Sequence, residues 1–271
     1  MQVMYPEGTT PKGIHPVGVF CEGWAVWRRC AGLLSKLYLL IFAPVYIVTI
    51  IISFMLPAKI ETPAQITLTV ISALLVMLVG IWGGVAMILA VVKNMTGSEN
   101  SVGANISEAK GYFFRYLITT ILYTLILVLV ILLGTFIAGS IGGALGKNTA
   151  SGVTTIVLIV ITLLAAAYFF IRLFLCGTVC VLENIGPIAA LKHANALVKK
   201  HMALVIGVML LVFLTLVLVG APMWGLAAVY KNSDSVDTVS QVYQFITNIV
   251  FMPVWTAIMV ILCNKLKEAN A

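Results

Sequence analysis

Six long apolar runs dominate this chain of 271 residues and constrain its fold more than any other feature. A helix needs about 20 mostly apolar residues to cross the hydrocarbon core of a bilayer. The six predicted spans are Leu37–Leu56, Ile66–Val92, Leu117–Ile141, Val153–Phe174, Ala203–Val229 and Phe245–Cys263. Backbone groups in hydrocarbon must be paired within the span, and continuous runs are not the alternating pattern of a β-barrel. We therefore expect an all-α integral membrane protein with six transmembrane helices.

The composition favours the same class. Hydrophobic residues make up 62% of the chain and charged residues 9%, whereas soluble domains contain about 45–50% apolar and about 25% charged residues. A chain with these proportions cannot bury its apolar side chains in a water-soluble core. Soluble enzymes, nucleic-acid-binding domains, disordered chains and secreted disulfide scaffolds are therefore disfavoured.

The placement of the basic residues predicts the orientation. Thirteen of the sixteen Lys and Arg fall on one side of the predicted spans, and only Lys59, Lys147 and Lys231 fall on the other. The positive-inside rule places the thirteen, and with them both termini, in the cytoplasm. Because these charges are spread over juxtamembrane segments, the net charge of +7 indicates orientation and contact with anionic lipids rather than a nucleic-acid partner.

This orientation divides the chain into three parts. Residues 1–36 form a cytoplasmic N-terminal segment, residues 37–263 a six-helix transmembrane domain, and residues 264–271 a cytoplasmic tail. The first 18 residues contain three prolines and no apolar core, unlike a cleavable signal peptide. We expect the first span to act as a retained signal anchor.

Three cytoplasmic segments mix polar and apolar residues just before a span, namely Gly18–Leu34, Ser101–Tyr116 and Glu183–His201. On a helical wheel of the third segment the apolar residues occupy one half and the lysines the other. We expect three amphipathic helices in the interface, with basic side chains towards the headgroups. The alternative for the third is that its apolar side packs on the bundle. The candidate headgroup contacts are Arg28, Arg29, Arg115, Lys192, Lys199 and Lys200.

The spacing of basic positions suggests an internal repeat of one amphipathic helix followed by two membrane helices. Arg28 and Arg115 lie 87 residues apart, and Arg115 and Lys199 lie 84 apart. Membrane bundles often contain such repeats. Recurring topology alone would also produce part of this spacing, so the repeat is a hypothesis.

The run from Arg172 to Lys199 reads RLFLCGTVCVLENIGPIAALKHANALVK. It resembles a signature in the six-helix membrane domain of glycerophosphoryl diester phosphodiesterases and their stand-alone bacterial relatives. Members similarly place an Arg late in the fourth helix, then an acidic residue, Gly-Pro, Ala-Leu and a basic helix. The resemblance implies a bacterial inner-membrane location and a link to envelope or lipid homeostasis. The family's catalytic domain is a separate soluble barrel, for which this chain has no room, so hydrolase activity does not carry over.

The chain offers little catalytic chemistry. All nine Asp and Glu fall outside the spans, which disfavours proton- or sodium-coupled transport. The three His are scattered, the five Cys lie on the predicted cytoplasmic side, and no metal, phosphate-loop or nucleophile motif occurs. We expect no enzymatic activity and no cofactor. Arg172, the one charge inside a span, either extends to the headgroups or pairs with Glu183.

The sequence thus favours a non-enzymatic polytopic inner-membrane protein that contacts lipids or other membrane proteins. One alternative is an uncoupled transporter, or a transport-complex subunit, with a cavity near Pro222, Asn248 and Pro253. A third candidate is a membrane-embedded lipid enzyme. Pro44, Pro222 and Pro253 lie within spans and are predicted to kink their helices.

Overall fold

The structure is a computed structural model, and it describes residues 14–55, 63–144, 149–229 and 234–270. These residues form eight helices and no strand. The helices are α1 (Pro16–Met55), α2 (Pro63–Thr96), α3 (Val102–Ala144), α4 (Thr149–Leu173), α5 (Cys176–Glu183), α6 (Pro187–Lys200), α7 (Met202–Val229) and α8 (Asp234–Asn270).

Six helices in the described residues are long and apolar enough to cross a membrane. They are α1, α2, α3, α4 with its continuation α5, α7 and α8. Each overlaps one of the six predicted spans, so the predicted all-α fold and the six helices long and apolar enough to cross a membrane are confirmed. The helices extend beyond the apolar runs, because polar flanking segments continue the same helical backbone.

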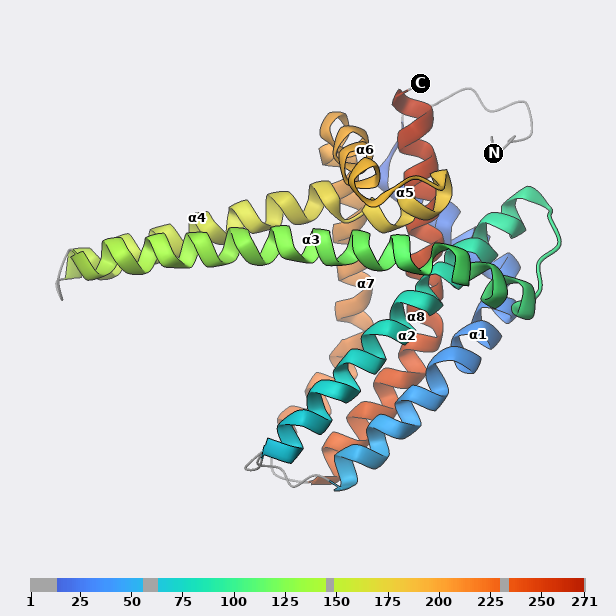
Figure 1. Cartoon of the computed structure of the whole chain (residues 1–271), viewed down its shortest axis with the longest axis horizontal. Helices are drawn as coiled ribbons and strands as arrows, with labels where there is room; N and C mark the ends of the chain where they lie inside the picture. Colours follow the sequence, from blue (N-terminus) through green and yellow to red (C-terminus); the bar gives the residue numbers. More distant parts are fainter. Residues whose placement is uncertain (1–13, 56–62, 145–148, 230–233, 271) are drawn as a thin grey trace.

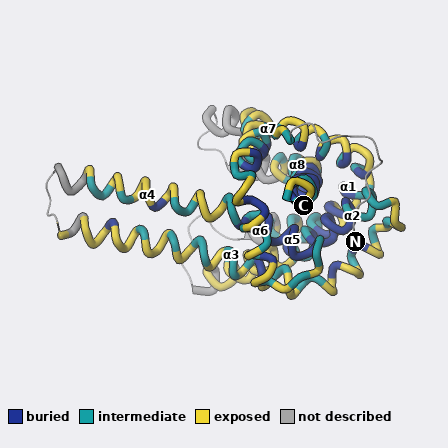
Figure 2. The backbone as a smooth tube through the Cα atoms, turned by 90° about the horizontal axis from the view of Figure 1, so that it is seen from above, coloured by how far each residue is buried: buried dark blue, intermediate teal, exposed yellow. Residues whose placement is uncertain are grey.

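The helices form a bundle with a projecting hairpin. Helices α1, α2, α7 and α8 lie in the bundle, and α3 and α4 run side by side away from it (Figure 1). Burial is concentrated around α1, α2, α5 and α8, while most of the hairpin is exposed (Figure 2). Its exposed side chains include Leu132, Phe136 and Leu164. A continuous apolar surface of this kind suits contact with lipid rather than water.

Small residues bring two helix pairs close together. A Cβ added at Gly83 of α2 would lie 2.6 Å from the Phe42 ring of α1. A Cβ at Gly134 of α3 would collide with Thr162 of α4. At Gly83 and Gly134 the absence of a side chain therefore lets the paired helices approach closely, as small residues do between membrane helices.

The main break in α1 is not at its proline. The backbone leaves helical geometry at Cys30 (φ −116°, ψ 15°), fourteen residues before Pro44. The amphipathic start of α1 changes direction there before the apolar run begins. Helices α7 and α8 continue through Pro222 and Pro253, and kinks at these two prolines remain predictions.

Only one of the three amphipathic segments forms a helix of its own. The first is the start of α1, and the second is continuous with the apolar part of α3. The third forms α6, whose Ala190, Ala194, Leu197 and Val198 are buried. These four residues pack against neighbouring helices, as the alternative interpretation predicted, whereas Ile188 on the same predicted side is 63% exposed. A position of α6 in the membrane interface remains a prediction. Its lysines are exposed as expected.

Candidate functional site: a pocket between α2 and α3

The amphipathic start of α3 is fastened to the end of α2 by polar contacts. Asn100 donates to the Ala90 carbonyl (2.7 Å), and the buried Asn105 donates to Asn100 Oδ1 (2.7 Å). Gly97, directly after the end of α2, has a positive φ of 66°, a conformation that glycine adopts readily. The backbone N–H of Ala104 donates to Ser101 Oγ (3.3 Å) in the first turn of α3. This short connection fixes where α3 crosses α2.

Two further contacts hold the helices together along the crossing. Lys93 Nζ lies 2.7 Å from Glu108 Oε2, and Trp82 Nε1 donates to the Ile106 carbonyl (3.2 Å). Because the indole N–H is paired, the rest of the Trp82 ring is presented as an apolar surface.

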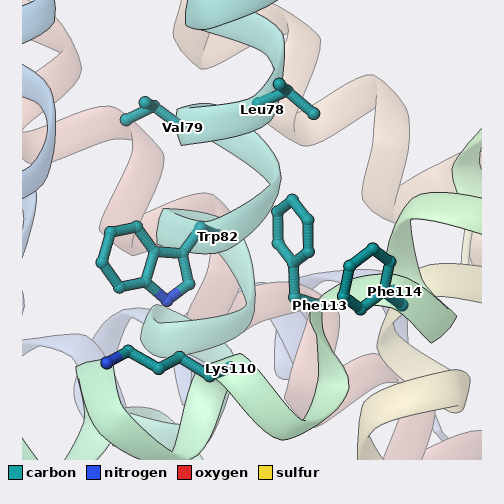
Figure 3. Close-up of a pocket in the computed structure, with 6 residues that line it drawn as sticks. All are labelled: Leu78, Val79, Trp82, Lys110, Phe113 and Phe114. Atoms are coloured by element: carbon teal, nitrogen blue, oxygen red, sulfur yellow. The ribbon is translucent and has the colours of Figure 1, made fainter.

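The crossing leaves a pocket of about 390 Å³, which we call the side pocket. Its lining residues are Leu78, Val79 and Trp82 of α2, and Lys110, Phe113 and Phe114 of α3. In Figure 3 the Lys110 side chain runs beneath the Trp82 indole, and the Phe113 ring stands along α2. The pocket therefore combines aliphatic and aromatic walls with one cation.

The contacts of α1 indicate the depth of the side pocket. Gly83, next to Trp82, meets Phe42, which lies five residues inside the apolar run that begins at Leu37. Five helical residues correspond to about 7.5 Å. The pocket thus lies just inside the apolar zone, where the four-carbon stem of Lys110 can extend its charge towards the headgroups.

The Lys110 ammonium group is available for a ligand. No ion pair to it occurs among the described residues, whereas Lys93, Lys265 and Lys267 each lie within 4 Å of a carboxylate. Lys110 and Phe114 are both exposed, and the Phe114 side chain is 70% exposed. An unpaired cation beside exposed aromatic rings suits a ligand with an anionic group and an apolar tail.

Arg172 does not pair with Glu183, which was one of the two interpretations that the sequence left open for Arg172. Glu183 Oε1 lies 2.9 Å from Lys267 Nζ, and Glu183 Oε2 lies 2.5 Å from His193 Nδ1. Arg172 Nη1 instead donates to the Tyr168 hydroxyl (2.5 Å). The physical reason is α5, whose eight residues carry Glu183 about 12 Å along the chain.

The six predicted headgroup contacts lie at the surface. Arg115 is exposed and tied to the protein, because it donates to the side-chain and backbone carbonyl oxygens of Asn184. Asn184 adopts a positive φ of 53° at the end of α5, and this turns its carbonyl towards Arg115. The other five are also exposed: Arg28, Arg29, Lys192, Lys199 and Lys200. Contact of these side chains with lipid remains a prediction.

A cavity of about 350 Å³ lies beside Pro253, because Met252, Trp255 and Thr256 of α8 line it. Asn248 and Pro222 are not among its lining residues, and a transport path through it remains a prediction. Asn248 donates to the Tyr46 hydroxyl (3.1 Å), which joins α8 to α1. Pro253 is buried and Pro222 is exposed. The polar group of Asn248 is thus used in helix packing.

Sequence reasoning missed Lys110, Phe113 and Phe114 as site residues. The local signal was Lys-Gly-Tyr-Phe-Phe-Arg, in which adjacent aromatic residues stand between two cations. The partner wall on α2 had no signal, since Leu78, Val79 and Trp82 belong to an ordinary apolar run. Only the crossing of the two helices defines the pocket.

In the described ranges, no three His, Cys, Asp or Glu side chains are grouped so that they could hold a metal ion. The five cysteines are free, and Cys21 alone is exposed. The fold and site define a multi-pass helical membrane protein with an apolar pocket between α2 and α3. No protein-family model, curated protein or solved structure matches this chain.

Proposed function

We propose that this chain is a non-enzymatic lipid-binding protein of the bacterial inner membrane. The side pocket receives part of an anionic phospholipid, with an acyl chain against Trp82 and Phe114 and a phosphate beside Lys110. The observation that carries this proposal is the pairing of an apolar, aromatic pocket with one cation that has no described ion-pair partner.

The size and composition of the pocket support this ligand class. Its volume of about 390 Å³ lies in the range of small-ligand pockets, about 300–1,000 Å³. It holds a portion of a lipid, and the remaining acyl chain extends along the exposed apolar surfaces. Lysine binds a phosphate as a point charge, so the pocket selects an anionic headgroup without a fixed orientation.

The proposal includes an orientation. Both termini, Lys110 and the basic amphipathic segments face the cytoplasm, where anionic lipids attract juxtamembrane lysines and arginines. The three amphipathic segments act as surface elements of a threefold helix-plus-hairpin repeat. The resemblance to membrane domains of phosphodiesterases supports a role in envelope or lipid homeostasis, in which the protein contacts lipids and other membrane proteins.

The test measures lipid retention by the full chain. The protein is purified from membranes in mild detergent and its bound phospholipids are quantified by native mass spectrometry. Replacing Lys110 by Gln should lower retained phosphatidylglycerol about tenfold, because a hydrogen bond to a charged group is worth about 1.5–3 kcal/mol.

The matched control is Lys36→Gln, which removes the same charge from an exposed juxtamembrane position outside the pocket. Phe114→Ala should weaken retention of all phospholipids, since it removes apolar contact and leaves the charge in place. Equal losses in the Lys110 and Lys36 variants would contradict the proposal.

A further inference from the structure

A second cavity lies on the other face of α3. It has a volume of about 560 Å³ and lies between the ends of α2, α5 and α8 and the first turns of α3. We call it the polar cleft. Its charged lining residues are Lys93, Glu108, Glu183 and Lys267.

The polar cleft is separate from the side pocket because of helical geometry. Glu108 and Tyr112 line the cleft and are four residues apart, so they share one face of α3. Lys110, Phe113 and Phe114 line the side pocket and fall on the opposite face. Binding in the polar cleft is therefore independent of lipid binding in the side pocket.

Each wall of the cleft carries one ion pair. On the α2–α3 wall, Lys93 Nζ lies 2.7 Å from Glu108 Oε2. On the α5–α8 wall, Lys267 Nζ lies 2.9 Å from Glu183 Oε1. Three of these four side chains are at most 30% exposed, and Glu108 is 42% exposed. Partial burial strengthens the interaction of these charges with a ligand that excludes water.

The two carboxylates differ in how many of their oxygens are already paired with a cationic or hydrogen-bonding partner. Glu183 contacts both Lys267 and His193, so both of its oxygens are engaged. Glu108 lines the cleft and has one ion-pair partner among the described residues, Lys93, which contacts only its Oε2 atom. Glu108 is thus the acceptor for an added cation, while the two lysines, one on each wall, are donors for an added anion.

The charges of the four side chains cancel. A simple anion entering the cleft is attracted by two lysines and repelled by two carboxylates. A simple cation is attracted by the two carboxylates and repelled by the two lysines. A zwitterion with its charges separated can pair with both signs at once and leaves no charge unpaired in a partly buried site.

We propose that the polar cleft binds a zwitterion that carries an ammonium group and a phosphate, the chemistry of phosphoethanolamine. The phosphate oxygens accept from Lys93 and Lys267, because a phosphate has enough acceptor oxygens for donors on two walls. The ammonium donates to Glu108. Asn264 and Tyr112 line the cleft and provide further polar groups.

The experiment measures binding to the full chain in detergent by titration calorimetry, with O-phosphoethanolamine, inorganic phosphate and ethanolamine as probes. O-phosphoethanolamine should bind at least about tenfold more tightly than either of the other probes, the ratio expected for one additional charge-assisted interaction. Equal affinity for O-phosphoethanolamine and inorganic phosphate would overturn the proposal.

Glu108→Gln supplies the sharper readout. It leaves the cleft with a net positive charge, so the preference should reverse, with phosphate bound more tightly and O-phosphoethanolamine more weakly than in the unmodified chain. Glu22→Gln is the control, because Glu22 is also paired with a lysine, Lys265, but lies outside the cleft. The same reversal in the control would contradict the assignment. Should the Glu108 variant not fold, Lys267→Gln must weaken binding of both phosphate-containing probes, and unchanged binding would overturn the proposal.

The source of the zwitterion is distinguished by repeating the titration in nanodiscs. If the ligand is a lipid headgroup, phosphatidylethanolamine in the disc should block binding of soluble O-phosphoethanolamine, whereas phosphatidylglycerol should not. If the ligand is a soluble molecule, both discs should bind it equally. Absence of binding in both discs and in detergent would refute the proposal.

Discussion

Adjacent glycines in α2 allow a test of the packing between α1 and α2. A methyl group added at Gly83 would lie 2.6 Å from Phe42 Cε2 and 3.1 Å from Ile41 Cγ2. Phe42 cannot move away freely, because its ring stacks on that of Tyr38 at 4.5 Å and Tyr38 is 1% exposed. A methyl group at Gly84 has only the Tyr116 hydroxyl within 4 Å, at 3.9 Å, and enters a cavity of about 350 Å³.

The two substitutions should therefore have opposite effects on stability. Overpacking costs about 1–3 kcal/mol, and replacing a helical glycine by alanine recovers about 0.4–1 kcal/mol. Gly83→Ala should lose up to about 2.6 kcal/mol overall, towards the upper end because the Phe42 ring is held in place. Gly84→Ala should gain about 0.4–1 kcal/mol, since its methyl group meets no obstacle.

The assay is thermal or denaturant unfolding of the full chain in one detergent, followed by tryptophan fluorescence. The unfolding midpoint should fall for Gly83→Ala and rise slightly for Gly84→Ala. Both variants replace a glycine of α2 by alanine, so their effects on helix propensity and on expression should be the same. Equal destabilisation of the two variants, or a neutral Gly83→Ala, would refute the described contact between α1 and α2.

Two further predictions concern topology and ion pairing. A membrane-impermeant maleimide should label the native chain at Cys21 alone and from the cytoplasmic side, since Cys21 is the exposed cysteine. The variant Lys147→Cys, at a position outside the described residues, should react from the other side. The opposite labelling pattern would refute the orientation. A double-mutant cycle on unfolding free energy should give a coupling of about 0.5–3 kcal/mol for Glu183 with Lys267. The cycle for Glu183 with Arg172 should give a value near zero, and a larger coupling would contradict the described partners.

The class of protein and the positions of its membrane helices could be predicted from the sequence because they depend on local composition. Each apolar run must form a helix in hydrocarbon whatever its neighbours are. Helical periodicity also predicted the exposed Lys192 and Lys199 and the buried Ala194 of α6, although Ile188 on the apolar side is exposed. What the wheel could not tell is whether the buried side of α6 faces lipid or protein, because both are apolar.

Partners of charged residues were beyond sequence reasoning. Arg172 and Glu183 are near in the chain, and proximity suggested a pair, but α5 separates them. Lys267 lies 84 positions after Glu183 and reaches it because the end of α8 packs beside α5 and α6. An ion pair depends on the last few ångströms of side-chain placement, and the order of residues does not specify those distances.

The sequence by itself determined that this chain is helical, that six of its helices can cross a membrane, and that its basic residues lie mainly on one predicted side. These properties follow from how each segment partitions between water and lipid. Only the tertiary structure decided that Lys110 lies beside Trp82 and that Lys93, Glu108, Glu183 and Lys267 surround one cleft. The side pocket forms where the consecutive helices α2 and α3 cross, and the cleft forms where their ends meet α5 and α8. Both arrangements depend on how the side chains of the helices pack together.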